Sequence, residues 1–277
     1  MNPTQGEKAE KLKALHEAPG IFAIPNPWDA GSTHILTHLG FEALATTSAG
    51  LAFSLAKPDG TGAVTRDENL ANARIIVEAT HLPVAGDLEN GYGDEPEVCA
   101  ETIRLAAAAG LVGGSIEDAS EDPAAPIYPV DLAVRRVQAA VKAARQLSFP
   151  FALAARAENF LHGRPDLDDT IRRLQAFAEA GADILFAPGL TTAEQISAVV
   201  RAVAPRPVNV VMGLGKGDFT LGQLAALGVR RVSLGSTLAR AAYGPFWQAA
   251  EEIRQKGSFS FAKNITRYGE FQKLFGS

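Results

Sequence analysis

The sequence predicts a single (β/α)8 barrel of the TIM type, from its length, from its alternating strand and helix patterns, and from its lack of linkers. A chain of 277 residues can bury one large core, and barrels of this type typically use about 250 residues. No Pro/Gly/Ser-rich or low-complexity tract interrupts the alternation. We therefore expect one domain over residues 1–277, with the barrel at about 20–240 and a helical extension at about 241–277.

Short apolar runs bounded by Gly, Pro or polar residues predict eight strands. In chain order they are Ile21–Pro25, Ala43–Thr47, Pro83–Gly86, Gly113–Ile116, Phe151–Ala155, Ile184–Ala187, Val208–Met212 and Arg231–Leu234. Longer amphipathic stretches between them predict helices at Arg66–Thr80, Glu95–Ala109, Asp131–Gln146, Asp166–Ala180, Thr191–Val203 and Leu221–Leu227. Several of these end in Ala-Gly or Leu-Gly, a common helix C-cap. Eight such units indicate a closed parallel barrel.

The chain continues beyond the eighth strand with more helix than closing a barrel requires. This extension carries five aromatic residues that need an apolar surface: Phe246, Trp247, Phe261, Phe271 and Phe275. A second subunit would supply that surface, so we expect a homo-oligomer.

The composition argues against several classes of partner. Acids outnumber bases 31 to 26, and the basic residues are scattered, so we expect no nucleic-acid partner. The N-terminus is polar, and no segment approaches the roughly 18 apolar residues that cross a bilayer, which predicts a soluble, cytoplasmic protein without a membrane partner. The only cysteine, Cys99, lies in a helical pattern and is expected to be a buried structural thiol rather than a nucleophile.

Four carboxylates follow predicted strands: Asp59, Asp87, Glu89 and Glu117. Loops after the strands form the catalytic face of a barrel, so these side chains should converge there. Hard cations prefer oxygen ligands, and crowded acids without a cation would raise each other's pKa. The pattern predicts a Mg²⁺ site, with Mn²⁺ as an alternative. Taken alone, Asp59 in its Pro-Asp-Gly turn is an ordinary turn residue.

The strand-end motifs together resemble those of the isocitrate lyase/phosphoenolpyruvate mutase superfamily. TTSAG, KPDG, GDLENGYG, SIEDAS and ARAENF occur in this order over most of the chain. The resemblance implies a modified barrel whose last helix is exchanged between subunits, within a dimer or a dimer of dimers. It also implies that the protein binds Mg²⁺ together with a 2-oxo acid or its enolate, and makes or breaks a C–C or P–C bond next to it.

The same resemblance assigns roles to individual residues. It makes Asp87 the principal metal ligand, with Asp59, Glu89 and Glu117 holding the metal's water shell. It places Thr47, Ser48 and the Ala49 amide on the substrate carboxylate. Arg156 would bind a carboxylate or the developing enolate oxygen, and Mg²⁺ would act as a Lewis acid.

The loop after the fourth strand departs from the family. Superfamily members that cleave isocitrate or 2-methylisocitrate carry Lys-Lys-Cys-Gly-His there, whereas this chain reads ASEDPAAPIYPVD, without Cys, Lys or His. The lysine and asparagine of the phosphonate-cleaving and mutase branches are missing too. Where those branches have His or Glu after the sixth strand, this chain has Pro188.

The remaining motifs suffice to bind a 2-oxo acid and stabilise its enolate. They predict a Mg²⁺-dependent lyase that decarboxylates an oxaloacetate-like acid or cleaves a related one by a retro-aldol reaction. Arg156 and Glu117 are catalytic candidates. Tyr128 and His162 are the candidate proton donors, although residues of these types in such places are more often surface or positioning residues.

Several other functions stay open at this point. They are P–C chemistry on phosphonopyruvate, 2-methylisocitrate cleavage with a different acid, and a barrel that binds a 2-oxo acid without turnover. A phosphate site is a further alternative, built from GLGKGD and LGST after the last two strands. His34 and His38 have the i, i+4 spacing of a zinc pair, but without a third ligand such a pair is most often a helix surface.

Overall fold

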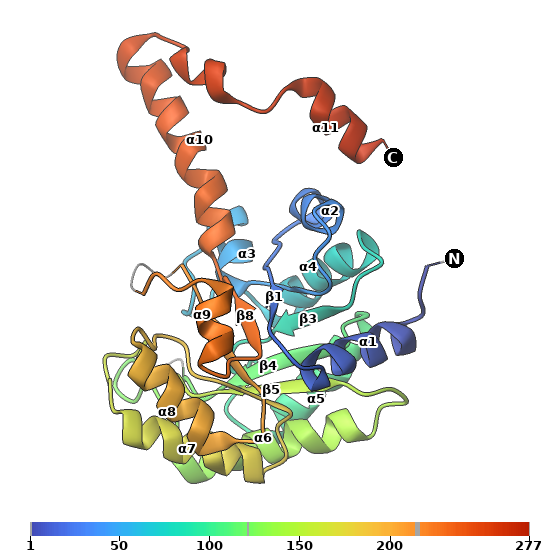
Figure 1. The fold of residues 1–277 in the computed structure, drawn as a ribbon, viewed down its shortest axis with the longest axis vertical. Helices are drawn as coiled ribbons and strands as arrows, with labels where there is room; N and C mark the ends of the chain where they lie inside the picture. Colours follow the sequence, from blue (N-terminus) through green and yellow to red (C-terminus); the bar gives the residue numbers. More distant parts are fainter. Residues whose placement is uncertain (1, 121, 214–216, 277) are drawn as a thin grey trace.

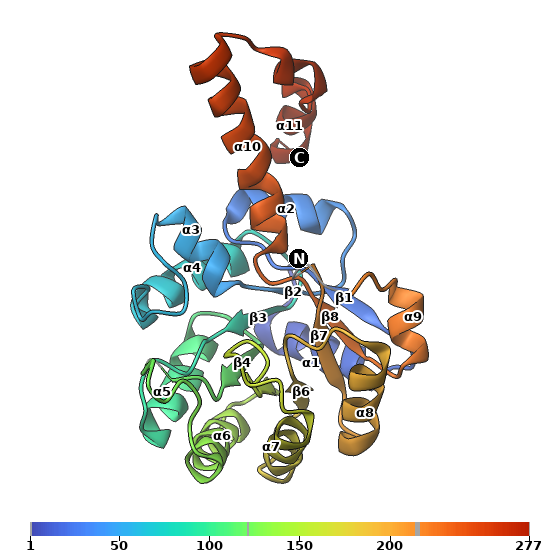
Figure 2. The same cartoon turned by 90° about the vertical axis from the view of Figure 1, so that its left-hand side faces the viewer.

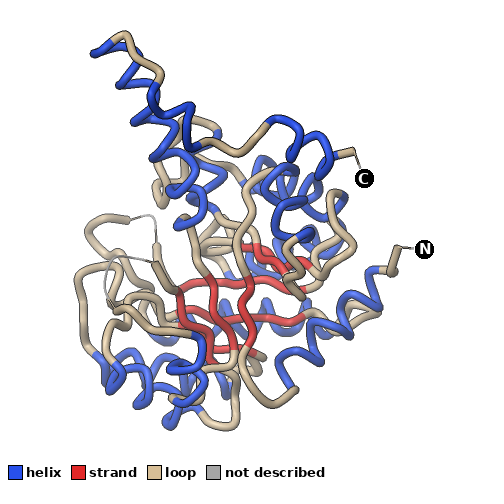
Figure 3. Tube along the Cα trace, turned by 45° about the horizontal axis from the view of Figure 1, so that its top comes forward, coloured by secondary structure: helices blue, strands red, loops and turns tan. Residues whose placement is uncertain are grey.

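The computed structural model describes residues 2–120, 122–213 and 217–276, and it confirms the predicted (β/α)8 barrel (Figure 1). Eight parallel strands form its centre, drawn in red in Figure 3. They are β1 (Phe22–Ile24), β2 (Leu44–Ala45), β3 (Val84–Asp87), β4 (Gly113–Glu117), β5 (Ala152–Arg156), β6 (Ile184–Phe186), β7 (Val208–Val211) and β8 (Arg231–Ser233). Each overlaps a run predicted from the sequence.

The strands follow one another around the barrel in the order β1-β8-β7-β6-β5-β4-β3-β2, so the ladder is nearly closed. Between its two ends, β1 and β2, the Ala45 amide donates to the Pro25 carbonyl at 3.0 Å. Because all strands are parallel, their carboxyl ends meet at one face of the barrel. Residues that follow each strand are therefore brought together there.

Helices surround the strands. They are α1 (Gln5–Glu17), α2 (Ala30–His38), α3 (Ser48–Ser54), α4 (Arg66–Glu78), α5 (Pro96–Ala108), α6 (Val130–Arg145), α7 (Leu167–Glu179), α8 (Ala193–Val203) and α9 (Leu221–Ala226). Six of them, α4 to α9, overlap the stretches predicted from the sequence. The core lies between strands and helices, where Phe151 and Leu153 pack with Ile103 of α5, and Leu185 packs with Phe177 of α7. Burial of these side chains stabilises the barrel by about 1.5 to 3 kcal/mol each.

Several helices begin with a capping box, in which a Thr hydroxyl and a Glu or Gln side chain satisfy backbone groups reciprocally. Thr65 and Glu68 begin α4 in this way, and Thr192 and Gln195 begin α8. These caps fix the residue at which each helix starts. They therefore also set the length of the loop between that helix and the strand before it. No helix within residues 2–120, 122–213 and 217–276 is long and apolar enough to cross a membrane.

The C-terminal extension leaves the barrel as an arm (Figure 2). It consists of α10 (Thr237–Lys256), a 3-10 turn (Ser260–Asn264) and α11 (Tyr268–Phe275). Phe246 and Trp247 on α10 are 70% and 68% exposed in the single chain. The end of α11 returns to the body, where the Phe275 ring meets His34 of α2 edge-on. Much of the arm's apolar surface is therefore left uncovered by the part of the chain that the structure describes.

Candidate active site

A pocket of about 170 Å³ opens at the carboxyl ends of the strands, where the sequence placed the catalytic face. Its lining includes six of the residues predicted to form the site: Thr47, Ser48, Ala49, Asp59, Asp87 and Arg156. Known ligand pockets for drug-sized molecules measure about 300 to 1,000 Å³, so this one suits a smaller molecule.

Arg156, at the end of β5, links three acids in this region. Its Nη1 lies 2.9 Å from Asp87 Oδ1 and 3.1 Å from Glu117 Oε2. Its Nε and Nη2 both lie 2.8 Å from Glu158 Oε1. Two of these contacts are hydrogen bonds, from Nε to Glu158 and from Nη1 to Asp87, and the other two are ion pairs. A guanidinium has five N–H donors, so at least one N–H on Nη2 is left for a ligand.

The charge state of Arg156 is fixed by this environment. Burial lowers its pKa, but the carboxylates of Glu117, Glu158 and Asp87 outweigh burial, and the pKa rises above its usual value. The guanidinium also lies over the Phe186 ring, 4.9 Å from its centroid. A permanent cation is thus held in one orientation in the wall of the pocket.

Asp87, at the end of β3, is oriented from several sides. The Ser48 amide and hydroxyl donate to its Oδ2 at 3.0 and 2.9 Å, while Arg156 binds Oδ1. Its backbone is fixed too, since its amide donates to Thr46 Oγ1 and its carbonyl accepts from the Asn69 side chain. Both carboxylate oxygens have a defined direction before any ligand binds.

The predicted carboxylates act on one another electrostatically. Burial raises the pKa of Asp59, and the charge of Asp87 raises it further. Burial likewise raises the pKa of Glu117, Arg156 opposes this rise, and Glu158, Asp87 and Glu89 add to it. Such mutual effects place the acids in one neighbourhood. Asp59 and Asp87 line the pocket, while Glu117 lies behind them against Arg156.

Glu89 has an unusual backbone conformation, with φ at 47°. Its carbonyl accepts from the Glu117 amide at 3.0 Å, which ties the loop after β3 to the end of β4. Left-handed backbone at a non-glycine residue is uncommon and occurs often at functional sites. The GDLENGYG motif therefore forms a constrained turn that carries two of the acids.

Tyr92 is a site residue that the sequence reasoning missed. Its hydroxyl is buried and has no hydrogen-bond partner within the described residues. Burial raises its pKa, and the charges of Glu89, Asp87, Glu117 and Asp59 raise it further. This neutral donor therefore lies near all four predicted acids. Its place in GYG, directly after the Asp87 motif, was the available signal.

The TTSAG segment lies at the junction of a strand and a helix that was not predicted from the sequence. It ends β2 and begins α3, and the Thr47 hydroxyl caps that helix by accepting from the Gly50 amide at 3.2 Å. Ser48 is already bound to Asp87. Thr47, Ser48 and Ala49 all line the pocket, while their predicted contact with a substrate carboxylate stays a prediction.

The two candidate proton donors lie outside the pocket lining. The Tyr128 hydroxyl donates to Asp94 Oδ1 at 2.6 Å and accepts from Asn90, and its ring lies under Arg136. His162 is exposed in the turn after β5. Neither side chain is brought to Arg156, so the geometry favours positioning and surface roles.

The loop after β4 folds on itself. Ala119 and Ile127 form an antiparallel bridge, the Ser120 amide donates to Pro126, and the Tyr128 amide donates to Asp118. Glu121 lies outside the described residues. The loop therefore has its own hydrogen bonds and carries no thiol, imidazole or amine.

Asp118, next to Glu117 at the end of β4, supports the site without lining the pocket. It is buried, accepts from the Glu158 amide at 2.8 Å and pairs with Arg173 at 3.0 Å. Burial raises its pKa to about 6, against the pull of the Glu158 amide and Arg173. It fixes the backbone of Glu158, which in turn orients Arg156.

The carboxylates fit a hydrated Mg²⁺ by the chemistry of their oxygen donors and by their uncompensated negative charge. No three His, Cys, Asp or Glu side chains in residues 2–120, 122–213 and 217–276 are close enough to coordinate an ion directly. Mg²⁺ commonly keeps several waters and uses one or two carboxylates, so this arrangement suits an ion held partly through water. The ligand set remains a prediction.

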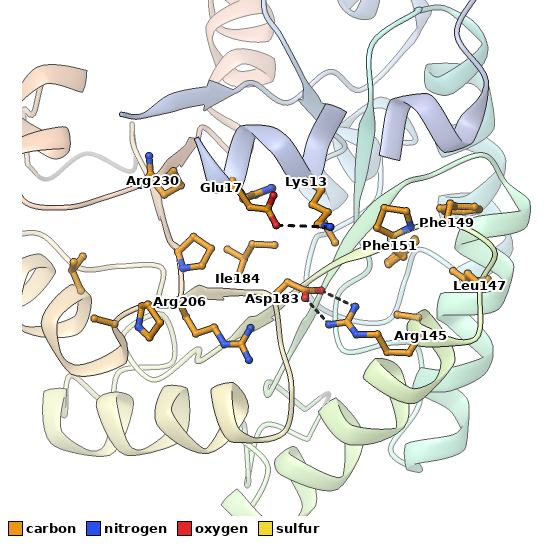
Figure 4. Close-up of a pocket in the computed structure, with 18 of the residues that line it drawn as sticks. Lys13, Glu17, Arg145, Leu147, Phe149, Phe151, Asp183, Ile184, Arg206 and Arg230 are labelled. Atoms are coloured by element: carbon orange, nitrogen blue, oxygen red, sulfur yellow. Dashed lines mark hydrogen bonds and ion pairs between the residues drawn. The ribbon is translucent and has the colours of Figure 1, made fainter. Parts of the chain in front are cut away.

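A larger pocket of about 1060 Å³ lies at the opposite, amino-terminal side of the strands, beside α1 (Figure 4). Lys13, Glu17, Arg145 and Asp183 form two ion pairs in its wall. None of the four predicted acids lines it. Barrel active sites lie at the carboxyl ends of the strands, so size does not identify the site here.

The remaining candidates are also resolved by their positions. Cys99 is buried as expected, with its pKa raised by burial. His34 and His38 are exposed on α2. Leu214, Gly215 and Lys216 of GLGKGD lie outside the described residues. In LGST, the Leu234 and Gly235 amides both donate to Asn26 Oδ1, at 2.8 and 3.0 Å. These two amides are therefore already hydrogen-bonded and do not support the phosphate site.

Comparison with known proteins identifies the family. The family model described as phosphoenolpyruvate phosphomutase matches residues 12–254. A protein of Burkholderia cenocepacia J2315, for which a lyase or mutase activity has been suggested, has a similar crystal structure. The TM-score is 0.95 at 56% identity, over 99% of this chain and 97% of that one.

Two sequence relatives have named activities. The 2-methylisocitrate lyase of Aeropyrum pernix is 30% identical over 256 residues, which cover 89% of this chain and 80% of the relative. The oxaloacetate decarboxylase of Bradyrhizobium diazoefficiens is 29% identical over 228 residues, which cover 78% of this chain and 76% of the relative.

Proposed function

Because this chain belongs to the phosphoenolpyruvate phosphomutase family, part of the isocitrate lyase/phosphoenolpyruvate mutase superfamily, we propose that it is a Mg²⁺-dependent carbon–carbon lyase. Its substrate is a small 2-oxo or 2-hydroxy dicarboxylate, and it decarboxylates an oxaloacetate-like acid or cleaves a related one by a retro-aldol reaction. The observation that carries the proposal is the setting of Arg156. Three acids hold its guanidinium in the wall of a small pocket, and at least one N–H on Nη2 is left for a ligand.

The chain's own residues supply enolate stabilisation. Asp87 would hold Mg²⁺, with Asp59, Glu89 and Glu117 binding its waters, and the ion would supply Lewis-acid polarisation of the 2-oxo group. Arg156 offers a fixed positive charge and a free N–H to an oxygen that gains charge as the bond breaks. Ser48 keeps Asp87 in place while this happens.

The composition of the loop after β4 favours decarboxylation over a reaction that needs a general acid in the bond-breaking step. General acid or base help typically contributes about 10² to 10⁴-fold, and this loop has no Cys, Lys or His to supply it. Bond breaking in decarboxylation needs little proton transfer, and water can protonate the enolate afterwards. The similarity to an oxaloacetate decarboxylase supports the same choice.

A panel of acids tests the proposal. Purified protein is assayed with oxaloacetate and related 2-oxo diacids, 2-methylisocitrate, isocitrate and phosphonopyruvate, with and without Mg²⁺, and NMR identifies the products. We expect Mg²⁺-dependent turnover of an oxaloacetate-like acid and little turnover of 2-methylisocitrate or phosphonopyruvate.

The other outcomes name the alternatives. Efficient 2-methylisocitrate cleavage, as in the Aeropyrum pernix relative, would require an acid outside the β4 loop. Release of phosphate or a phosphonate rearrangement would indicate P–C chemistry. Tight, metal-dependent binding of a 2-oxo acid without any product would indicate a barrel that only binds its ligand.

A further inference from the structure

A second arginine, Arg231, lies in the wall of the same pocket. It is on β8 and is 6% exposed, and it lines the pocket next to Asn209 of the neighbouring strand β7. The two residues are register partners in the sheet. Their side chains therefore point into the barrel, from a side of the ring different from that of Asp87 on β3.

Neutral groups hold Arg231 in place. Its Nε donates to Asn209 Oδ1 at 2.8 Å, and its Nη1 lies 3.4 Å from His16 Nε2. The His16 Nδ1 lies 2.8 Å from the Leu12 carbonyl, which can only accept, so Nδ1 carries the proton and Nε2 is a lone pair facing Arg231. Burial and the charge of Arg231 hold the pKa of His16 at about 3, which keeps the ring neutral.

No carboxylate of the described residues lies within ion-pair distance of Arg231. Asp87, Glu117 and Glu158 are bound to Arg156 instead. Burial lowers the pKa of Arg231 to about 10, and the charge of Arg156 contributes to that shift. A buried cation without a counter-charge destabilises a fold, and an apolar side chain of similar volume would fill the space without that cost.

We propose that Arg231 is the specificity-determining residue that binds the second carboxylate of a small dicarboxylate. This inference rests on the proposed function, because it takes the first end of the acid to lie at Arg156 and Asp87. Asn209 and neutral His16 orient the guanidinium without neutralising it, so its charge is available to the ligand. The pocket of about 170 Å³ limits that ligand to a short diacid.

Binding of two stable acids that differ by one carboxylate tests Arg231 without any turnover. L-malate and L-lactate are titrated by calorimetry into wild-type protein, Arg231→Met and Arg206→Met, at one fixed Mg²⁺ concentration. Arg206 is an exposed arginine beside the other pocket and serves as the matched control for loss of one positive charge. Thermal melting without ligand reports whether each variant is folded.

We expect the wild type and Arg206→Met to bind malate about 10- to 100-fold more tightly than lactate, as a charge-assisted pair would provide. Arg231→Met should lose that preference and bind lactate as the wild type does. If Arg231→Met does not fold, Arg231→Gln, which can still reach Asn209, is measured in its place with the same expectation.

A wild type that binds malate no more tightly than lactate, or binds neither, overturns the inference. An Arg231 variant that keeps the preference for malate overturns it as well. The proposed function is judged separately by Mg²⁺-dependent turnover. Turnover can occur without a role for Arg231, and an Arg231-dependent preference can occur in a barrel that has no turnover.

Discussion

At the scale of single residues, the site depends on two arginines with opposite surroundings. Arg156 is enclosed by acids, whereas Arg231 is held by an amide and a neutral imidazole. The acids neutralise and orient Arg156, whereas Arg231 has no acidic partner among the described residues and keeps its charge. A dianion that bridges them would bind at both ends of the pocket, which links the enolate chemistry to the choice of substrate.

Replacing Arg156 with lysine should impair catalysis severely. A lysine is a compact point charge and cannot donate to Asp87, Glu117 and Glu158 in the fork geometry of the guanidinium. We expect kcat to fall about 10² to 10³-fold, as for loss of one oxyanion-stabilising donor. Steady-state kinetics measure this, and a kcat within about twofold of the wild-type value would exclude Arg156 from the chemical step.

Asp87→Ala should abolish metal-dependent activity with little loss of stability. The change removes one of several crowded acids, which relieves repulsion, although it leaves Ser48 without its acceptor. Calorimetric titration with Mg²⁺ measures the metal affinity directly. Unchanged Mg²⁺ affinity in the variant would show that the metal site lies elsewhere.

Tyr128→Phe and His162→Ala should leave kcat nearly unchanged. The Tyr128 hydroxyl is already hydrogen-bonded to Asp94 and Asn90, and the His162 side chain is exposed. Loss of the Tyr128 hydrogen bonds should lower the free energy of unfolding by about 1 kcal/mol. A kcat reduced by 10²-fold or more in either variant would restore that residue as the proton donor.

At the scale of elements, the strands could be predicted from the sequence because each is a short apolar run that ends at Gly or a polar residue. The acids at strand ends followed, since a parallel barrel places all those ends on one face. Helix α3 could not be predicted in the same way. Its start within TTSAG depends on the Thr47 cap and on the contact between Ser48 and Asp87, which is remote in sequence.

The residues missed by sequence reasoning share one property. Tyr92 and Arg231 are single polar residues whose meaning depends on neighbours from other elements. Arg231 at the start of a strand reads as a solvated strand-end charge, and only the pairing with Asn209 shows that it is buried. The patterns that predict elements carry no information on such cross-barrel contacts.

Helix α1 is attached to the barrel through His16, and this contact should make stability depend on pH. The folded-state pKa of His16 is about 3, below the ordinary value of 6.5. Between these pH values the unfolded chain binds a proton that the folded protein does not, so the free energy of unfolding falls as the pH is lowered. The full stability is present above about pH 6.5.

Comparison with His16→Gln isolates this effect from other titrating groups. Lowering the pH from 7 to 5 should reduce the free energy of unfolding of the wild type by about 2 kcal/mol more than that of the variant. This follows from a slope of about 1.4 kcal/mol per pH unit below the unfolded-state pKa. Urea unfolding at the two pH values measures the difference. The same pH dependence in both proteins would show that His16 titrates normally in the folded state.

At the scale of the whole molecule, the arm is the feature that one chain does not explain. Its exposed aromatic side chains include Phe246, Trp247, Phe259 and Tyr268. The resemblance to the superfamily implies a helix exchanged between subunits, and the shape of the arm in Figure 1 suits such an exchange. We propose that a second copy of this chain covers these rings in a dimer or a dimer of dimers.

Truncation after Gly257 should convert the assembly to smaller and less stable species. Gly257 ends α10 in the left-handed conformation, so the cut removes the 3-10 turn and α11 but leaves α10 complete. Each buried Phe is worth about 1.5 to 3 kcal/mol, so losing several is comparable to the whole free energy of unfolding of a typical domain. Trp247→Ser should weaken assembly as well, whereas Leu221→Ser, at an exposed position on the barrel, should not. Analytical ultracentrifugation measures the outcome, and an unchanged number of subunits in the truncated protein would exclude the exchanged arm.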